Sequence, residues 1–454
     1  MPDPAPQAEI RRPAPARRRL CDHAAVAPRP LLVCPAETEE TAVLPPADAP
    51  VPLDEGFLAD PHGVCAGLHR RGAVHRAVAP DTTPLWLITG YEQVREAAAD
   101  PRLALDKRHA RSRGAAGDSL PPELDAHLLN RDGADHARLR RLVAAALGPR
   151  RTEALREPIR RTADALLDHV EARGRGDVVA DLAAPLAVAV ICDLLGVPSG
   201  HRVDFRVWTD TLLSPDPGAP GRSRDAMRAM HGFLGELIAH KRAVPGDDLL
   251  SELIAAERDP QAPEDPPGEG PAGEAGLTER ELLAMAFLLL FAGYHNTVGL
   301  ISGTVLALLT RPRELAAVRA GRLGLSAVTE EVLRWDPPAM LAVRRFPTED
   351  LTVDGTRIAA GDRVWLSWAA ANRDPARFPD PDAFDPARQG PPHLAFGRGP
   401  HFCAGAALAR AENEIAVGAL LRRFPRLALD ADPATLTRRR SLRSRCPAAL
   451  PVRV

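Results

Sequence analysis

The feature that most constrains the fold of this 454-residue chain is the long apolar stretch of residues 282–309. A helix that starts at the capping box of Thr278 and Glu281 and runs through this stretch would extend roughly 45 Å. The stretch is long enough to cross a membrane, but the polar residues 294–297 lie in its middle, where lipid would leave them without partners. The sequence therefore predicts a helix buried in a large protein core.

The rest of the chain also favours helices. Apolar residues recur at helical spacing in five further segments, residues 139–146, 159–172, 183–195, 225–241 and 314–320. Alternating apolar residues around turn residues predict a hairpin over residues 74–89 and a second one over residues 351–358. We therefore expect a fold that is mainly α with small β-sheets.

The first 50 residues differ in composition from the rest of the chain. Residues 1–50 are rich in proline and arginine and contain no Phe, Tyr or Trp, which predicts a disordered tail before one globular domain of residues 51–454. The net charge of −2 gives no support to nucleic-acid binding, and there is no N-terminal apolar run of signal-peptide or anchor length. We expect a monomeric cytoplasmic protein that binds neither nucleic acid nor membrane.

One cysteine lies in a segment with unusual chemistry. Cys403 follows Gly399, precedes Gly405 and stands directly before a predicted helix over residues 404–423. Backbone N–H groups and the helix dipole favour an anion at such a position, so we expect a lowered thiol pKa. The two glycines would let the backbone approach a flat ring. The alternative is that Cys403 is a small buried apolar residue like most cysteines.

The spacing of Phe396, Gly399, Cys403 and Gly405 resembles the haem-binding signature of the cytochrome P450 family. The resemblance extends over nearly all of residues 51–454, and it is closest to the soluble bacterial members that act in secondary metabolism. It implies a cytochrome P450-like fold with the long central helix over the haem. It also implies that the Cys403 sulfur is the axial ligand of haem b iron.

Two further sets of residues match family motifs. Glu331 and Arg334 lie three residues apart on one predicted helix face, and with Arg388 they match a buried structural triad. A haem also brings two propionates that need cationic or hydrogen-bonding partners. The resemblance implies four propionate ligands, which are His136, Arg140, Arg345 and His401.

The middle of the long helix departs from the family pattern, which is glycine, any residue, an acid and two threonines. Gly293 and Thr297 are retained, whereas His295 stands at the acid and Asn296 at the first threonine. By resemblance these four residues are the catalytic ones, and we hypothesise that His295 donates protons through water. The alternative is that His295 and Asn296 only satisfy each other and backbone carbonyls.

The resemblance implies a haem-thiolate monooxygenase that oxidises a small hydrophobic natural product, free or tethered to a carrier protein, with O2. It also implies that electrons from NAD(P)H arrive through ferredoxin reductase and ferredoxin, which cationic residues could attract. The residues with that charge near Cys403 are Arg398, Arg410, Arg422 and Arg423. Three alternatives remain open: oxidative coupling or desaturation, a variant that uses peroxide directly, and a haem-free, non-catalytic partner protein.

Overall fold

The fold is known from a computed structural model, which describes residues 46, 49–112, 121–213, 219–257, 276–442 and 444–454. The tail predicted for residues 1–50 lies almost wholly outside the described residues. The division of the chain at residue 50 therefore stays a prediction.

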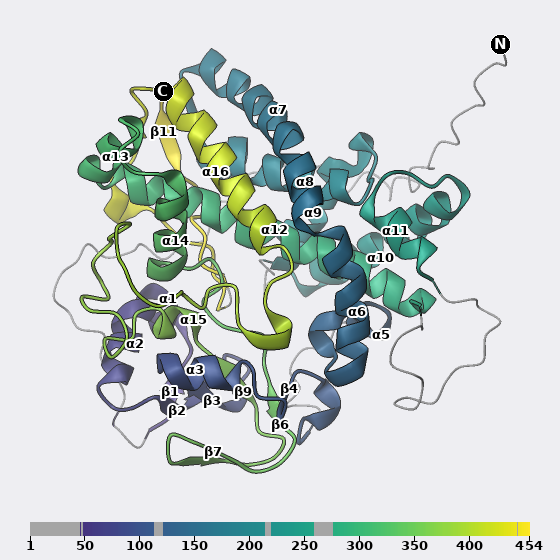
Figure 1. Cartoon of the computed structure of the whole chain (residues 1–454), viewed down its shortest axis with the longest axis vertical. Coiled ribbons are helices and arrows are strands. Elements are labelled where there is room, and N and C mark those ends of the chain that lie inside the picture. The colour runs from purple at the N-terminus through teal and green to yellow at the C-terminus, as the bar shows by residue number, and fades with distance from the viewer. Residues whose placement is uncertain (1–45, 47–48, 113–120, 214–218, 258–275, 443) are drawn as a thin grey trace.

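Helices make up most of the described chain, as predicted (Figure 1). Their bounds are α1 Glu55–Ala59, α2 Pro61–His69, α3 Tyr91–Ala97, α5 Pro122–Asp125, α6 Gly133–Ala146, α7 Pro149–Arg173, α8 Ala184–Leu194, α9 Arg202–Leu213, α10 Pro220–Ala243, α11 Leu249–Ala255, α12 Glu279–Leu309, α13 Pro312–Arg319, α14 Leu325–Trp335, α15 Trp368–Ala371 and α16 Ala406–Arg423. Each of the segments predicted from helical periodicity falls on one of them. Figure 1 shows α16 and α7 packed side by side, with α12 passing behind them.

The strands form small sheets, in the orders β1-β2-β3-β9, β10-β11-β5, β4-β6 and β7-β8. Their bounds are β1 Val51–Pro52, β2 Val74–Val78, β3 Pro84–Ile88, β4 Leu103–Ala104, β5 Arg175–Asp177, β6 Phe346–Pro347, β7 Leu351–Val353, β8 Thr356–Ile358, β9 Val364–Leu366, β10 Ala428–Leu429 and β11 Pro451–Arg453. Both predicted hairpins are confirmed, since β2 pairs antiparallel with β3 and β7 with β8. The second hairpin turns at Asp354 and Gly355, which both have positive φ.

The long apolar stretch forms α12, which contacts α5, α8, α14 and α16. The predicted capping box is present: Thr278 Oγ1 accepts from the Glu281 N–H at 3.2 Å, and Glu281 Oε2 accepts from the Thr278 N–H at 3.0 Å. Among the described residues, α12 is the single helix apolar and long enough to span a membrane, and 78% of its most apolar window is buried inside the protein. It is the central helix of the core.

Candidate active site

A cavity of about 570 Å³ lies where α12 faces the segment that leads into α16. Its lining brings together Cys403, His295, Arg140 and Arg345, which are far apart in the sequence. Most of the other lining residues are apolar, and they come from many parts of the chain, including α8, α12, α16, the stretch 338–343 and the segment around Cys403. The residues that sequence motifs single out thus meet around one cavity.

Local backbone geometry turns Cys403 toward this cavity. Gly397 and Gly399 have φ values of 75° and 74°, a left-handed conformation that favours glycine. The chain then folds back, so that the Cys403 N–H donates to the Phe396 carbonyl at 2.8 Å, and α16 begins three residues later. Cys403 has accessible surface and lines the cavity, so it is not packed inside the core as the alternative interpretation requires, although protein atoms surround its thiol closely enough to desolvate it.

The two glycines around Cys403 have different surroundings. A Cβ on Gly399 would lie 2.9 Å from the Cα of Ala99, and Gly399 is absent from the cavity lining. A Cβ on Gly405 would meet no atom within 4 Å, and Gly405 does line the cavity. The geometry is therefore consistent with close approach of a flat ring at Gly405. Gly399 instead allows the loop to pack on Ala99, and Gly397, which the sequence did not single out, lines the cavity.

The expected direction of the Cys403 pKa is wrong for the polypeptide on its own. Burial raises the pKa of the Cys403 thiol, against a backbone hydrogen bond from Gly405 and the charges of Arg140 and Arg410, which lower it. The start of a helix is too small an effect to offset desolvation here. A bound cation at the sulfur is what would keep it a thiolate.

Cationic and hydrogen-bonding side chains collect at one side of the cavity. Arg345 is 4% exposed, and its Nη1 donates to the Leu103 carbonyl at 3.1 Å. Burial lowers the pKa of Arg345 to about 10, so it remains charged at neutral pH. His401 lies between His136, at a ring-centroid distance of 4.0 Å, and Asp132, whose Oδ1 is 3.4 Å from its Nε2.

Several polar atoms of these side chains have no hydrogen-bond partner in the described part of the chain. The buried His136 Nε2, His401 Nδ1 and Arg345 Nε have no hydrogen-bond partner among the described residues. Burial, with the charges of His401 and Arg140, lowers the pKa of His136 to about 4, which keeps this imidazole neutral. Unpaired buried donors beside Arg345 and Arg140 fit a ligand that carries carboxylates, because each unpaired donor costs free energy until it is satisfied.

The middle of α12 borders the opposite part of the lining. A Cβ on Gly293 would lie 2.8 Å from Ile191 Cδ1 on α8, so the small residue lets the two helices pack closely. Thr297 Oγ1 donates to the Gly293 carbonyl at 3.0 Å, which uses its proton within the helix. His295 is 4% exposed, and its Nε2 has no partner among the described residues; Asn296 is open to the cavity.

His295 and Asn296, at the centre of α12, do not form a hydrogen bond with each other. Among the described residues no hydrogen bond joins His295 to Asn296, and His295 Nε2 has no partner, contrary to the alternative in which the two residues satisfy each other and backbone carbonyls. Burial, with the charge of Arg439, lowers the pKa of His295 to about 4 although Asp210 opposes this. His295 is therefore neutral at neutral pH, which argues against the hypothesis that its imidazolium is the proton donor.

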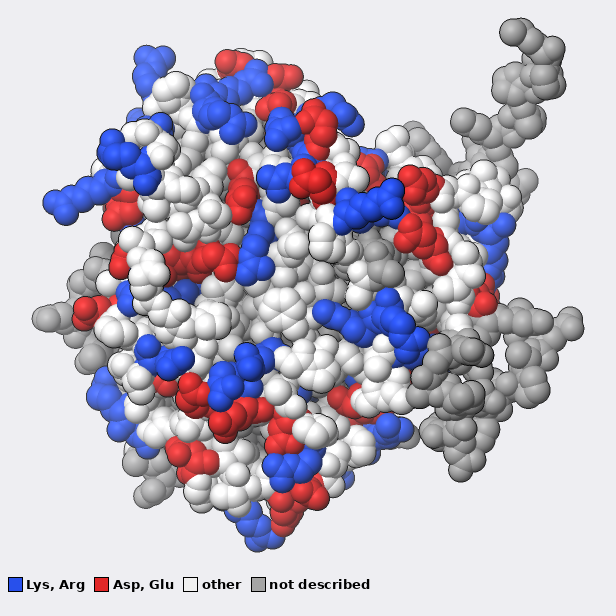
Figure 2. Space-filling model, viewed as in Figure 1, with Lys and Arg blue, Asp and Glu red and all other residues white. Residues whose placement is uncertain are grey.

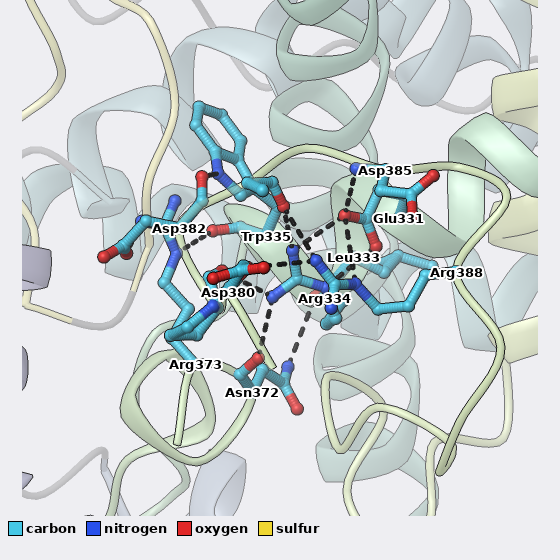
Figure 3. Close-up of polar contacts among 12 residues, drawn as sticks. Glu331, Leu333, Arg334, Trp335, Asn372, Arg373, Asp380, Asp382, Asp385 and Arg388 are labelled. Atoms are coloured by element: carbon cyan, nitrogen blue, oxygen red, sulfur yellow. Dashed lines mark hydrogen bonds and ion pairs between the residues drawn. The ribbon is translucent and has the colours of Figure 1, made fainter. Parts of the chain in front are cut away.

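The residues of the predicted structural triad lie close together (Figure 3). Glu331 and Arg334 are buried and joined by two hydrogen bonds, Nε to Oε2 at 2.8 Å and Nη2 to Oε1 at 2.7 Å. Arg388 Nε lies 3.9 Å from Glu331 Oε1, so it is the loosest member. Arg334 also donates to the carbonyls of Asn372 and Ala383, which anchors the chain that leads to Cys403.

A further ion-pair cluster, which the sequence did not predict, is centred on Glu330. Glu330 accepts hydrogen bonds from Arg410 at 2.6 and 2.8 Å, and it lies 3.2 Å from His393 Nε2. Burial would raise the pKa of Glu330, but these two partners outweigh it and lower the pKa to about 2. The Arg410 guanidinium also lies 4.5 Å from the centre of the Phe396 ring. The neighbour of the recognised Glu331 thus ties α14 to both sides of the cysteine segment.

Cavity, cysteine and cationic donors together define a site of the haem-thiolate class, and comparisons with known proteins agree. The cytochrome P450 family model matches residues 324–441. The chain is 42% identical over 403 residues to the cytochrome P450 monooxygenase PikC of Streptomyces venezuelae. The aligned region covers 88% of this chain and 92% of PikC.

Solved structures give the same result. The tirandamycin C-bound P450 monooxygenase TamI has a TM-score of 0.78 and 39% identity, covering 89% of this chain and all of TamI. P450BioI, solved with an acyl carrier protein that carries hexadec-9Z-enoic acid, has a TM-score of 0.77 and 31% identity over 88% of this chain and 99% of its own.

The chain belongs to the cytochrome P450 family. The predicted fold is confirmed, and so is the predicted activity, that of a haem-dependent monooxygenase supplied with electrons through redox partners.

Proposed function

We propose that this protein binds haem b with Cys403 as the axial ligand and oxygenates a hydrophobic natural product. The observation that carries this proposal is the convergence of Cys403, the α12 centre and the buried donors on one cavity of about 570 Å³. When bound, the haem would supply the activation of O2. The protein would supply the sulfur ligand, the partners of the propionates and a dry, shaped space for the substrate.

Arg345 and Arg140 would bind the propionates as cations, and His401 and His136 would bind them as hydrogen-bond donors. Their unpaired buried atoms support this assignment, because propionate oxygens would satisfy them. Asp132 holds the His401 ring, and it accepts the N–H groups of Leu105 and Asp106 at 2.8 and 2.9 Å.

The side chains that line the cavity indicate the class of substrate. The cavity is lined by leucine, valine and phenylalanine side chains, among them Val190, Leu212, Leu288 and Phe291, which favour an apolar molecule. PikC and TamI, whose names and ligand point to natural products, support a substrate of that kind. The carrier-bound ligand of P450BioI supports delivery on a carrier protein as a second possibility for this chain.

Electrons would come from NAD(P)H through a ferredoxin reductase and a ferredoxin. The protein itself would be a monomer in the cytoplasm. Figure 2 shows a largely uncharged area in the middle of one face of the molecule, bordered by Lys and Arg side chains and also by Asp and Glu side chains. Phe402, one residue before Cys403, is 42% exposed, and Arg398 is also exposed. Arg410 and Arg423 are engaged with Glu330 and Glu171, so the exposed Arg398 and Arg422 are the stronger candidates for contact with an acidic partner.

The absorption spectrum of the reduced protein with CO tests this function. We expect the red-shifted band of a thiolate-ligated haem in the wild-type protein and in Cys192→Ala, which removes a buried cysteine on α8. Cys403→Ala should lose that band and NADPH-dependent turnover. An unchanged spectrum in Cys403→Ala would contradict the proposal, and an absence of haem in the wild type would favour the non-catalytic alternative.

The stoichiometry of NADPH and product separates the remaining alternatives. A monooxygenase consumes one NADPH for each oxygen inserted, whereas a peroxide-using variant turns over without NADPH. Oxidative coupling or desaturation forms product that contains no atom from 18O-labelled O2.

A further inference from the structure

Among the described residues, three hydroxyl side chains line the cavity, and that of Ser444 has no partner. Thr297 Oγ1 donates to the Gly293 carbonyl, and Ser441 Oγ accepts from the Ser444 N–H at 3.2 Å. Ser444 is 5% exposed, and its own Oγ is buried without a hydrogen-bond partner in the described chain. A buried hydroxyl of this kind costs free energy until a ligand satisfies it.

The backbone around Ser444 is held at several points. Ser444 forms an antiparallel β-bridge with Ala339, and the N–H of Arg445 donates to the Pro338 carbonyl at 2.7 Å. Arg445 Nε also donates to Asp336 Oδ1 at 2.6 Å, and both of these side chains are almost fully buried. Because a serine hydroxyl is one bond away from Cβ, a fixed backbone at the border of the cavity also fixes where the hydroxyl can lie.

Ser444 lies near α12 and not beside the propionate donors. A Cβ on Gly299 of α12 would lie 3.0 Å from the Arg445 carbonyl, so the residue after Ser444 packs directly against this helix. The partner of Ser444 in its β-bridge is Ala339, six residues before Arg345, and a second β-bridge ties Arg345 to another segment. Ser444 and Arg345 therefore belong to opposite ends of the stretch 339–345. The Ser444 hydroxyl is better placed to bind a substrate than a propionate.

The lining around Ser444 is otherwise apolar. Pro338, Ala339 and Leu341 line the cavity from the stretch that pairs with Ser444, and Leu300 lines it from α12. Apolar walls select a ligand by size and shape, whereas a few polar groups fix its orientation. A site with a buried hydrogen-bonding group also rejects a molecule that leaves that group unpaired. The Ser444 hydroxyl should thus distinguish substrates that carry an oxygen from hydrocarbons of the same shape.

We propose that Ser444 is a specificity-determining residue, whose hydroxyl donates a hydrogen bond to a carbonyl or hydroxyl oxygen of the substrate. This inference rests on the proposed haem-thiolate function and narrows its substrate class. The substrate is then a largely apolar molecule that carries at least one such oxygen. The hydrogen bond orients this molecule in the cavity, because one fixed polar contact restricts the rotation that smooth apolar walls permit.

The test uses two probes that differ in one carbonyl oxygen, cyclododecanone and cyclododecane. Dissociation constants are measured from the shift of the haem Soret absorption band in the ferric protein. We expect the wild type to bind the ketone about 10-fold more tightly than the hydrocarbon, as one hydrogen bond provides. Ser444→Ala should lose this preference. The control Ser302→Ala should keep it, because Ser302 Oγ donates to the Val298 carbonyl at 2.7 Å and Ser302 is outside the cavity lining.

Two further readouts do not depend on affinity. The infrared C=O band of bound cyclododecanone should lie at lower frequency in the wild type and in Ser302→Ala than in Ser444→Ala. In the haem-free protein, Ser444→Ala should not lower the thermal unfolding temperature, because the fold gives this hydroxyl no partner among the described residues.

Three results would overturn the proposal: no tighter binding of the ketone by the wild type, a preference retained in Ser444→Ala, or destabilisation of the haem-free protein by Ser444→Ala. A wild-type protein without the reduced-CO band would instead remove the function on which the proposal rests.

Discussion

The backbone N–H of Leu394 donates a 2.6 Å hydrogen bond to the side-chain oxygen of Asn372, which has no exposed surface. The carbonyl of the same Asn372 accepts from Arg334 Nη1 at 3.1 Å. Leu394 lies two residues before Phe396, whose carbonyl accepts the Cys403 N–H. Asn372 thus connects the buried ion pair of α14 to the cysteine segment, through its backbone carbonyl on one side and its side chain on the other.

Asn372→Leu should therefore loosen the cysteine segment. The substitution keeps the size of the side chain but leaves the buried Leu394 N–H unpaired, which should lower the free energy of unfolding by about 1–3 kcal/mol. Haem should also be lost more readily. Urea unfolding and haem retention on dilution measure the two effects. The control is Gln389→Leu, an exposed amide in the same connection, which should change stability by less than about 0.5 kcal/mol.

Tyr294 links α12 to α9. Its hydroxyl donates to Asp210 Oδ1 at 2.9 Å, and Arg439 donates to the same atom at 3.0 Å. Tyr294→Phe removes one hydrogen bond to a charged acceptor and should cost about 1.5 kcal/mol. Amide hydrogen exchange in α9 should accelerate, while exchange in α14 should not. Unchanged exchange in α9 would show that Arg439 and Arg206 hold Asp210 without the tyrosine. Thr211→Val, which removes a hydroxyl bonded to the Val207 carbonyl of α9, is the control.

Much of the fold and site was predictable because it depends on short-range patterns. The capping box of α12, the turn at Asp354 and Gly355 and the Glu331–Arg334 pair each involve residues close in sequence. Their chemistry can be read without knowing the tertiary structure. Residues 1–45, with most of the predicted tail, fall outside what the structure describes.

What the sequence did not predict depends on burial and on partners from distant segments. Glu330 looks like any helix-surface acid until Arg410 and His393 reach it from segments 80 and 63 residues away. The sequence alone gives no reason to expect an unusual pKa for His295. Burial in the packed core lowers that pKa to about 4. Glu412 on α16 is 3% exposed, although an acid within a helix is usually solvated, and its burial depends on elements far away in the sequence.

The buried His295 should make the stability of the haem-free protein depend on pH. The unfolded chain takes up a proton at this residue below about pH 6.5, whereas the folded protein does so only below about pH 4. Folded stability should thus be fully present above pH 6.5 and fall towards pH 4, by up to about 3 kcal/mol. His295→Gln should flatten this decrease in urea unfolding curves, and His169→Gln, at an exposed position of α7, should not. A parallel decrease in His295→Gln and wild type would contradict the expectation.

The two glycines that flank Cys403 should respond differently to the same substitution. Gly399 has a φ of 74° and packs against the Ala99 backbone, so Gly399→Ala combines a left-handed conformation with a contact that cannot relax. We expect it to destabilise the haem-free protein by about 1–3 kcal/mol. Gly405 has a φ of −88° and open space around it, so Gly405→Ala should leave that stability within about 0.5 kcal/mol. Because Gly405 borders the cavity, its added methyl group should instead weaken haem binding. Thermal unfolding of the haem-free proteins and haem titration separate these effects, and equal destabilisation by both substitutions would contradict the assignment.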